Sequence, residues 1–347
     1  MAYRDDTVKE RVAFLSQDPD KLRTARGRAL YETLEGLGLT HSQFFRALDT
    51  NVQDYCAQEF GIDLNRITVD RFFQSDPNAK WLFPDIVRDA VVSGLKRKPV
   101  YPQLIIRDEP IHGTAYDVPY VQENSDEEEL RKVAEGASIP ESEITYGDRI
   151  VKLDKKGRGV IASYEVIRRM SVDMLKVHLQ RIGERLGRNL DARLATVLVS
   201  GDSSGAGTAP VTVNTATPGA WVYGDLVNGF MTLTLDHYFT PTHMLANAAL
   251  CQTLLGLAEI KDSVMFDFAK TGNLPTPLGV RLVPMVDQPA NKLTILDANY
   301  AVEKLTEQDL LVESDKLINQ QWDRTYLTVV TDFAIIYNKA RLVVKSD

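Results

Sequence analysis

Apolar residues recur at spacings of three and four between residues 171 and 199, and this period predicts one long amphipathic helix. Ser171 is a suitable N-cap residue, and Asp173 in the first turn suits the positive end of the helix dipole. Gly183 and Gly187 lie inside the helix, where each costs about 1 kcal/mol relative to Ala unless close backbone packing requires it. The apolar stripe consists of Leu175, Leu179, Ile182, Leu186, Leu190, Leu194 and Val197.

Residues 1–78 are polar and helix-prone, and they predict an N-terminal helical extension. Two helices are expected to meet at residues 36–40, where Thr40 can cap the second helix. The second helix is expected to run from Ser42 to about Asp54.

An apolar cluster at residues 81–87 follows a predicted break at 76–78 and leads into a short helix. Gly94 and Pro99 are expected to end this helix. A single helix of this length is marginal in water, so its aromatic end is expected to dock on another part of the protein.

Strand-like periodicity replaces the helical pattern after Val100. Residues 101–106 and 115–121 are expected to form strands, with their prolines favouring edge positions. The strand-like segments 144–153 and 160–164 are expected to complete a long two-stranded arm. Such a ribbon is marginally stable alone, which favours an arm that lies on a neighbouring subunit.

The predicted arm carries charges of both signs, which are candidates for contacts between subunits. Its acidic residues are Asp126, Glu127, Glu128 and Glu129, and its basic residues are Lys152, Lys155, Lys156 and Arg158.

The remainder of the chain alternates short helices and strands after a Gly- and Ser-rich loop at 201–207. No internal repeat of fixed period is found in the sequence. Helices are expected at 226–238 and at 248–257, the latter with Asn247 as its cap. Strands are expected at 242–245, 278–284 and 293–296, and residues 327–344 are strongly β-prone.

Composition places the chain among soluble globular proteins, with 44% hydrophobic and 25% charged residues among 347. The formal net charge of -8 argues against tight, sequence-independent binding to nucleic acid by the chain as a whole. Two cysteines without CxxC spacing, Cys56 and Cys251, argue against a disulfide framework and favour a reducing cytoplasm. Neither a secretory signal nor a membrane-spanning apolar run is expected.

The charged arm and the long helix resemble tailed-phage major capsid proteins, the family built on the Hong Kong 97 shell fold. The resemblance rests on the order of several segments and covers roughly residues 80–347. These segments are Val133-Ala134-Glu135-Gly136, Pro140-Glu141-Ser142, the strand pair, the capped long helix closed by Gly201-Asp202, and Gly279-Val280-Arg281-Leu282-Val283-Pro284. Residues 1–78 do not match the family.

The resemblance implies an α+β, HK97-like capsid fold. It assigns residues 1–78 to the N-terminal helical extension and 79–99 to an N-arm. A peripheral domain would comprise 100–204 and 321–347, with the extended arm (E-loop) at about 118–162 and the spine helix at 171–199. An axial domain would span 205–320, with loops that meet at five-fold and six-fold axes.

Three features of the sequence are similar to enzyme sites, but a structural role explains each of them better than a catalytic or binding role. Gly201-Asp202-Ser203-Ser204-Gly205 is similar to a serine-protease nucleophile loop, but its place after a long helix favours a flexible connection. Residues 157–162 satisfy a dinucleotide-binding pattern yet precede a strand, so the phosphate-binding helix terminus is missing. The histidines lack metal-ligand spacing, although His237 and His243 could meet across a turn. No catalytic residue, cofactor or metal is therefore expected.

Residues 32–51 could instead form a helix-turn-helix, which gives an alternative function as a DNA-binding regulator. The second helix offers Arg46 alone against Asp49 and Asp54, which favours packing on protein. The run Lys96-Arg97-Lys98 is the best candidate for contact with packaged DNA.

The resemblance therefore implies a non-enzymatic capsid subunit that self-assembles, as pentamers and hexamers, into an icosahedral shell around double-stranded DNA. It would assemble in the bacterial host cytoplasm and reside in the virion, without contact with a membrane. Portal, scaffold and decoration proteins are further candidate partners. An encapsulin-like shell that stores an enzyme is the first alternative.

Overall fold

The computed structural model describes residues 34, 45, 51–75, 82–97, 99–121, 132–133, 144–205, 208–260, 278–317 and 322–346. The chain forms two compact units, each assembled from segments that are far apart in the sequence. The first unit contains residues 1–98, 156–187 and 310–329, and the second contains 99–155, 188–309 and 330–347.

Short helices surround one apolar core in the first unit. Asn51 caps α5 (Val52–Phe60), because its side-chain oxygen accepts a hydrogen bond from the Asp54 amide at 2.7 Å. A helix therefore begins at Val52, and the expectation that one ends near Asp54 is wrong. The helices α6 (Val69–Ser75), α7 (Phe83–Arg97) and the start of α10 (Val172–Ser200) contribute to the same core, and the short helix α9 (Tyr164–Arg169) precedes α10.

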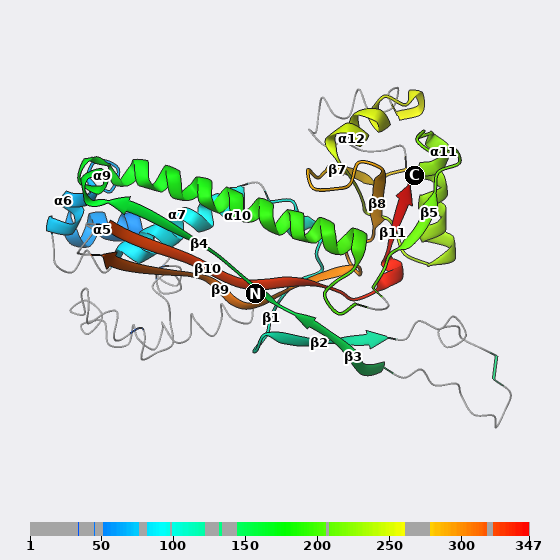
Figure 1. Cartoon of the computed structure of the whole chain (residues 1–347), viewed down its shortest axis with the longest axis horizontal. Helices are drawn as coiled ribbons and strands as arrows, with labels where there is room; N and C mark the ends of the chain where they lie inside the picture. The colour runs from blue at the N-terminus through cyan, green and yellow to red at the C-terminus, as the bar shows by residue number, and fades with distance from the viewer. Residues whose placement is uncertain are drawn as a thin grey trace. The chain divides into compact units, whose positions relative to one another are not determined.

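The long helix α10 confirms the prediction from apolar periodicity. Ser171 caps it, since its hydroxyl accepts a hydrogen bond from the Met174 amide at 3.2 Å. Helix α7 lies beside α10 (Figure 1), and two glycines permit this approach. A Cβ on Gly94 would lie 2.0 Å from the Gln180 carbonyl oxygen, and one on Gly183 would lie 2.0 Å from that of Val91.

A four-stranded sheet has the order β1-β9-β10-β4, with β1 and β9 parallel. The long strand β9 was not predicted. Strand β4 pairs with β10, so the expectation that residues 160–164 belong to the two-stranded arm is wrong. The strands of the four-stranded sheet are β1 (Asp108–Pro110), β9 (Val302–Leu317), β10 (Trp322–Ile335) and β4 (Asp154–Ser163).

A five-stranded sheet in the second unit has the order β5-β11-β8-β6-β7. Strand β11 lies between β5, to which it is parallel, and β8, to which it is antiparallel. The strands are β5 (Val211–Asn214), β11 (Arg341–Lys345), β8 (Lys292–Leu296), β6 (His243–Ala246) and β7 (Arg281–Pro284).

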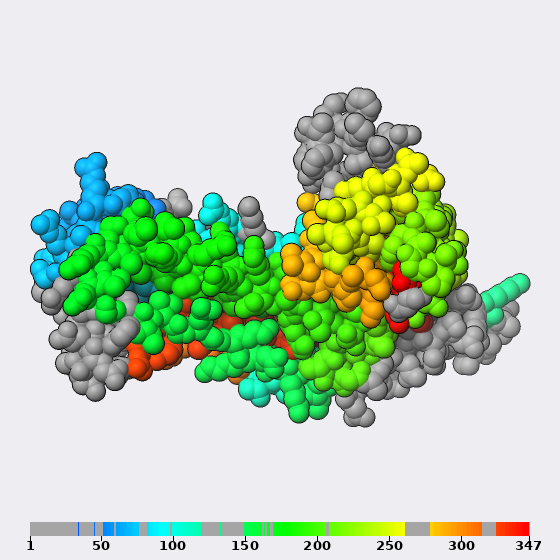
Figure 2. Space-filling view, turned by 45° about the horizontal axis from the view of Figure 1, so that its top comes forward, coloured from blue at the N-terminus to red at the C-terminus, as the bar shows by residue number. Residues whose placement is uncertain are grey.

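Helix α11 (Tyr223–Met231), the π-helical turn η3 (Thr232–Asp236) and α12 (Ala248–Leu255) contribute to the core on this sheet. Asn247 caps α12, as predicted, by accepting a hydrogen bond from the Leu250 amide at 2.7 Å. Figure 2 shows α11, α12 and the segment carrying β7 and β8 closed against one another. They share one apolar cluster, in which Leu226, Leu250 and Ile295 are buried.

Two further sequence predictions are wrong. Residues 101–106 contain no strand: a 3-10 turn, η2 (Tyr101–Gln103), forms there instead. The cause is the Asp191 carboxylate, which accepts hydrogen bonds from the backbone amides of Val100 and Tyr101. Gly94 does not end α7 but lies within it. A second 3-10 turn, η4 (Asn338–Ala340), precedes β11.

Candidate functional site

A two-stranded ribbon in the second unit forms the base of the predicted arm. Strand β2 (Ala115–Val121) pairs antiparallel with β3 (Ile144–Lys152), and the register shifts between Asp117 and Pro119. Among the described strands, these two pair with each other alone. Because a ribbon of this kind is marginally stable by itself, its base must be held by other contacts.

Alternate side chains of β3 provide these contacts. Arg149 and Val151 are buried, whereas Ile150 between them is 46% exposed. Val151 packs in an apolar cluster with Leu305 and Ala334, which fixes the ribbon to the second unit. Further along, the Lys152 amide donates a hydrogen bond to the Ser203 hydroxyl at 3.0 Å.

Arg149 extends this anchor into a buried ionic cluster. Its guanidinium donates to the Asp202 carboxylate at 3.0 Å and to the Ile335 carbonyl at 3.0 Å. The same carboxylate accepts hydrogen bonds from the Ile335 amide and the Ser204 amide, both at 3.0 Å. Asp202 is therefore a structural anchor, and the expectation that residues 201–205 form a flexible connection is wrong at this residue.

Arg341 is a second buried cation, and sequence reasoning missed it. Its guanidinium is fully buried and donates to the carbonyls of Val197, Leu198 and Thr208, the first at 2.6 Å. Burial lowers the pKa of Arg341 to about 9, and the Asp202 charge partly opposes this shift. Arg341 therefore satisfies carbonyl groups at the carboxyl end of α10, where a helix leaves acceptors without partners. No sequence signal distinguishes it from a surface arginine at a strand end.

The structure separates the predicted charged residues of the arm. Lys152 ends β3 on the ribbon, but Lys155, Lys156 and Arg158 lie on β4 in the four-stranded sheet. Lys155 and Arg158 are exposed, and Lys156 is half-buried. The acidic residues Asp126, Glu127, Glu128 and Glu129 lie outside the described residues.

The predicted DNA-facing residues lie at the carboxyl end of α7. Lys96 and Arg97 are exposed, and Lys98 lies outside the described residues. The Arg97 guanidinium lies 3.3 Å from the Glu184 carboxylate on α10.

The described part of the chain holds no group of three metal-ligating side chains. Burial lowers the pKa of His237 and of His243, so their neutral forms are favoured. The helix-turn-helix candidate at 32–51 lies outside the described residues except for three positions. Two of them, Leu34 and Phe45, are buried in the core of the first unit. None of the described helices combines the length and apolar character needed to cross a membrane.

Solved structures with a similar fold identify the fold class of this chain. The capsid subunit of an empty GTA particle is 14% identical, with a TM-score of 0.54, over 70% of this chain and 88% of that chain. A structure from Mycobacterium phage Che8 is 13% identical, with a TM-score of 0.52, over 71% of this chain and 91% of that chain. The virus-like particle from Pyrococcus furiosus is 14% identical, with a TM-score of 0.50, over 75% of this chain and 98% of that chain. These matches confirm the Hong Kong 97-like capsid fold.

Comparison with curated protein sequences finds no match. The phage capsid protein family, in contrast, matches residues 146–346, a span that begins in β3 and includes α10 and the complete five-stranded sheet. This span is more than half of the chain. The chain therefore belongs to the phage capsid protein family, a family of structural shell subunits.

Proposed function

We propose that this chain is the major head subunit of a tailed phage. Copies of it associate as pentamers and hexamers into a closed icosahedral shell that encloses double-stranded DNA. It acts as a structural protein, without a catalytic residue or cofactor. The phage assembles in the host cytoplasm, and portal, scaffold and decoration proteins are the further partners that such a shell requires.

The observation that carries this proposal is the β2–β3 ribbon with its buried base. Arg149 and Val151 of β3, with Leu153 directly after the strand, are buried on one side, while Ile150 stays exposed on the other. A ribbon that is fixed at its base and exposes Ile150 beside the charged side chains of Asp117 and Lys152 suits attachment to another copy of the chain. Family membership and the likeness to subunits of assembled shells support the same reading.

The charged residues of the arm refine this proposal. We assign contacts between subunits to Asp126, Glu127, Glu128 and Glu129, together with Lys152 on the ribbon and Lys155, Lys156 and Arg158 on β4. Opposite charges on separate elements can pair between neighbouring copies, which fixes register and partner choice more than affinity.

The test is electron microscopy of the chain expressed alone and purified by size-exclusion chromatography. Closed hollow particles tens of nanometres wide are expected. Monomers or small oligomers that persist when the phage's assembly partners are present would refute the proposal. Deletion of residues 124–131 should leave a folded subunit that assembles poorly, whereas normal shells from this deletion would refute the role of the arm.

The contents of native particles separate the alternative functions. Nucleic acid in the shell supports a virus, and a stored enzyme supports an encapsulin-like compartment instead. A regulator that uses residues 32–51 would form small oligomers and bind duplex DNA in a salt-sensitive manner.

A further inference from the structure

Exposed cations gather on α7 and α10 in the first unit. We call Lys96 and Arg97 on α7, with Arg181 and Arg185 on α10, the basic face. All four are exposed, with 64% of the Arg97 side chain and 59% of the Arg181 side chain accessible to solvent. This concentration of positive charge is unexpected in a chain whose formal net charge is -8.

One carboxylate organises the face without neutralising it. Glu184 lies within 3.3 Å of Arg97 and also pairs with Arg181, and only 20% of its side chain is exposed. A single negative charge is thus shared by two guanidinium groups, which holds them in place and leaves a positive excess. Arg181 and Arg185 are one helical turn apart, about 6 Å along the helix axis.

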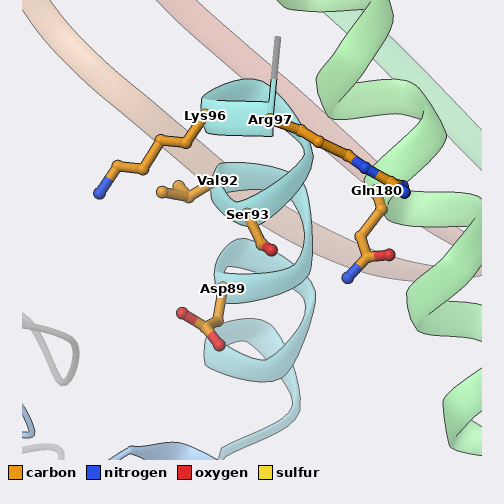
Figure 3. A pocket seen from close by; sticks show the side chains of 6 residues that line it. All are labelled: Asp89, Val92, Ser93, Lys96, Arg97 and Gln180. Atoms are coloured by element: carbon orange, nitrogen blue, oxygen red, sulfur yellow. The ribbon is translucent and has the colours of Figure 1, made fainter. Parts of the chain in front are cut away.

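A hollow of about 660 Å³ adjoins two of these cations, Lys96 and Arg97 (Figure 3). Figure 3 shows Arg97 extending towards α10, where Gln180 lies, and Lys96 extending from the same end of α7 in the opposite direction. Ser93 and Gln180 add a hydroxyl and an amide to the lining, and Asp89 is the one carboxylate among the six lining residues. Cations with neutral hydrogen-bond donors suit phosphate oxygens, and this mixture is typical of sites that bind nucleic-acid backbones.

We propose that the basic face binds the phosphate backbone of double-stranded DNA. It is therefore the surface of the subunit that contacts the packaged genome, an inference that rests on the proposed function. Contacts to phosphate groups carry no information about base sequence, so this binding is independent of DNA sequence. Because it releases counterions from the DNA, it is weakened by salt. A subunit that is acidic as a whole yet basic on one face binds DNA weakly there and repels it elsewhere, which suits a shell that must later release its genome.

The experiment measures binding of the full-length subunit to a mixed-sequence DNA duplex of about 30 base pairs by fluorescence anisotropy, at several salt concentrations. The face variant combines Lys96→Gln, Arg181→Gln and Arg185→Gln, and it retains Arg97 as the partner of Glu184. The matched control combines Arg66→Gln, Arg71→Gln and Arg281→Gln, three exposed positions elsewhere, so both variants lose the same charge. Thermal unfolding checks that both variants remain folded.

The face variant should lose at least about tenfold in affinity at low salt, while the control stays close to wild type. Each phosphate contact contributes about 0.9 to the slope of log K against log salt, so the slope should fall by about 2 to 3 in the face variant only. Equal losses in both variants, or an unchanged slope, would overturn the inference.

A peptide with the sequence of residues 122–131 tests the competing occupant, the acidic arm of a second copy. Binding of this peptide by wild type but not by the face variant, without DNA binding, would also overturn the proposal. Electron microscopy of the same preparations separates this result from the function itself. Shells that form normally while DNA binds elsewhere would refute the basic face alone, and absence of shells even with the phage's assembly partners present would refute the capsid function.

Discussion

Replacing either of the two glycines between α7 and α10 by Ala should lower the stability of the subunit, although helix propensity alone predicts an increase. In an exposed helix, replacement of Gly by Ala stabilises by about 1 kcal/mol. At Gly183 the new Cβ would lie 2.0 Å from the Val91 carbonyl oxygen and 2.8 Å from the Leu95 amide nitrogen. Both neighbours are backbone atoms, so the helices themselves must move apart by about 1 Å.

The size of the stability loss follows from the packing contacts between α7 and α10 that this separation weakens. The cluster between the helices includes Val87, Val91 and Leu179, and a gap of about 0.5–1 Å forfeits a quarter to a half of each dispersion contact across it. Overpacking costs typically about 1–3 kcal/mol, and contact with backbone places this site at the upper end. After the propensity gain is subtracted, Gly183→Ala should destabilise the subunit by about 2 kcal/mol.

Urea denaturation of the unassembled subunit, followed by circular dichroism, measures this effect as a lower unfolding midpoint. Gly224→Ala is the matched control, since Gly224 lies in α11 and is exposed, and its new Cβ would meet a Val222 methyl carbon at 4.0 Å, an ordinary van der Waals contact. The control should be neutral or slightly stabilising. Gly94→Ala should resemble Gly183→Ala, and the double variant should cost less than the sum because one separation relieves both clashes. A Gly183→Ala subunit at least as stable as wild type would refute the argument.

Three other predictions concern single side chains. Arg341→Met should destabilise by about 3–5 kcal/mol, because three buried main-chain carbonyls lose their donor; a change under about 1 kcal/mol in urea denaturation would show that they find other partners. Burial raises the pKa of Asp85 to about 7 from 3.8, so the folded state binds this proton more tightly than the unfolded state. Stability should therefore fall as pH rises from about 4 to about 7, and Asp85→Asn should flatten this part of the melting-temperature profile; an equally steep profile in the variant would contradict the assignment. Asn247→Ala should cost about 1 kcal/mol by removing the cap of α12, while Asn247→Asp, which keeps an acceptor, should melt close to wild type.

Local signals made much of the fold predictable from sequence. The apolar period and Ser171 located α10 to within one residue, and Asn247 located the start of α12. Both signals depend on neighbours in sequence. Residues 101–106 were misassigned because the Tyr101 amide at their start bonds to Asp191, about ninety residues away.

Strand β9 escaped prediction for a related reason. Glu303 and Lys304 are buried in it, which interrupts the alternation of apolar and polar residues that marks a half-buried strand. Their charges are satisfied by Arg107 at 3.1 Å and by Asp108 at 2.6 Å, on a segment nearly two hundred residues earlier. A single sequence cannot reveal such pairs.

The sequence identified the charged residues of the candidate site, but it did not predict which of them lie close together. The sequence indicated that Lys152, Lys155, Lys156 and Arg158 form one basic stretch, but strand pairing divides them between β3 and β4. Similarly, Lys96 and Arg97 could be selected as a basic run, whereas Arg181 and Arg185 join them only because α7 packs on α10. Tertiary pairing, rather than local composition, decides which charges act together.

The position of β11 has a consequence for the timing of synthesis. This strand lies between β5 and β8, yet residues 341–345 are translated after every other strand that the structure describes. Until they leave the ribosome, β5 and β8 each lack their shared partner, and Arg341 cannot reach the end of α10. We expect the second unit to remain open until β11 has been synthesised and to close only then. A prematurely terminated chain would therefore expose unpaired strand edges, which makes it a substrate for chaperones and proteases rather than a defective building block.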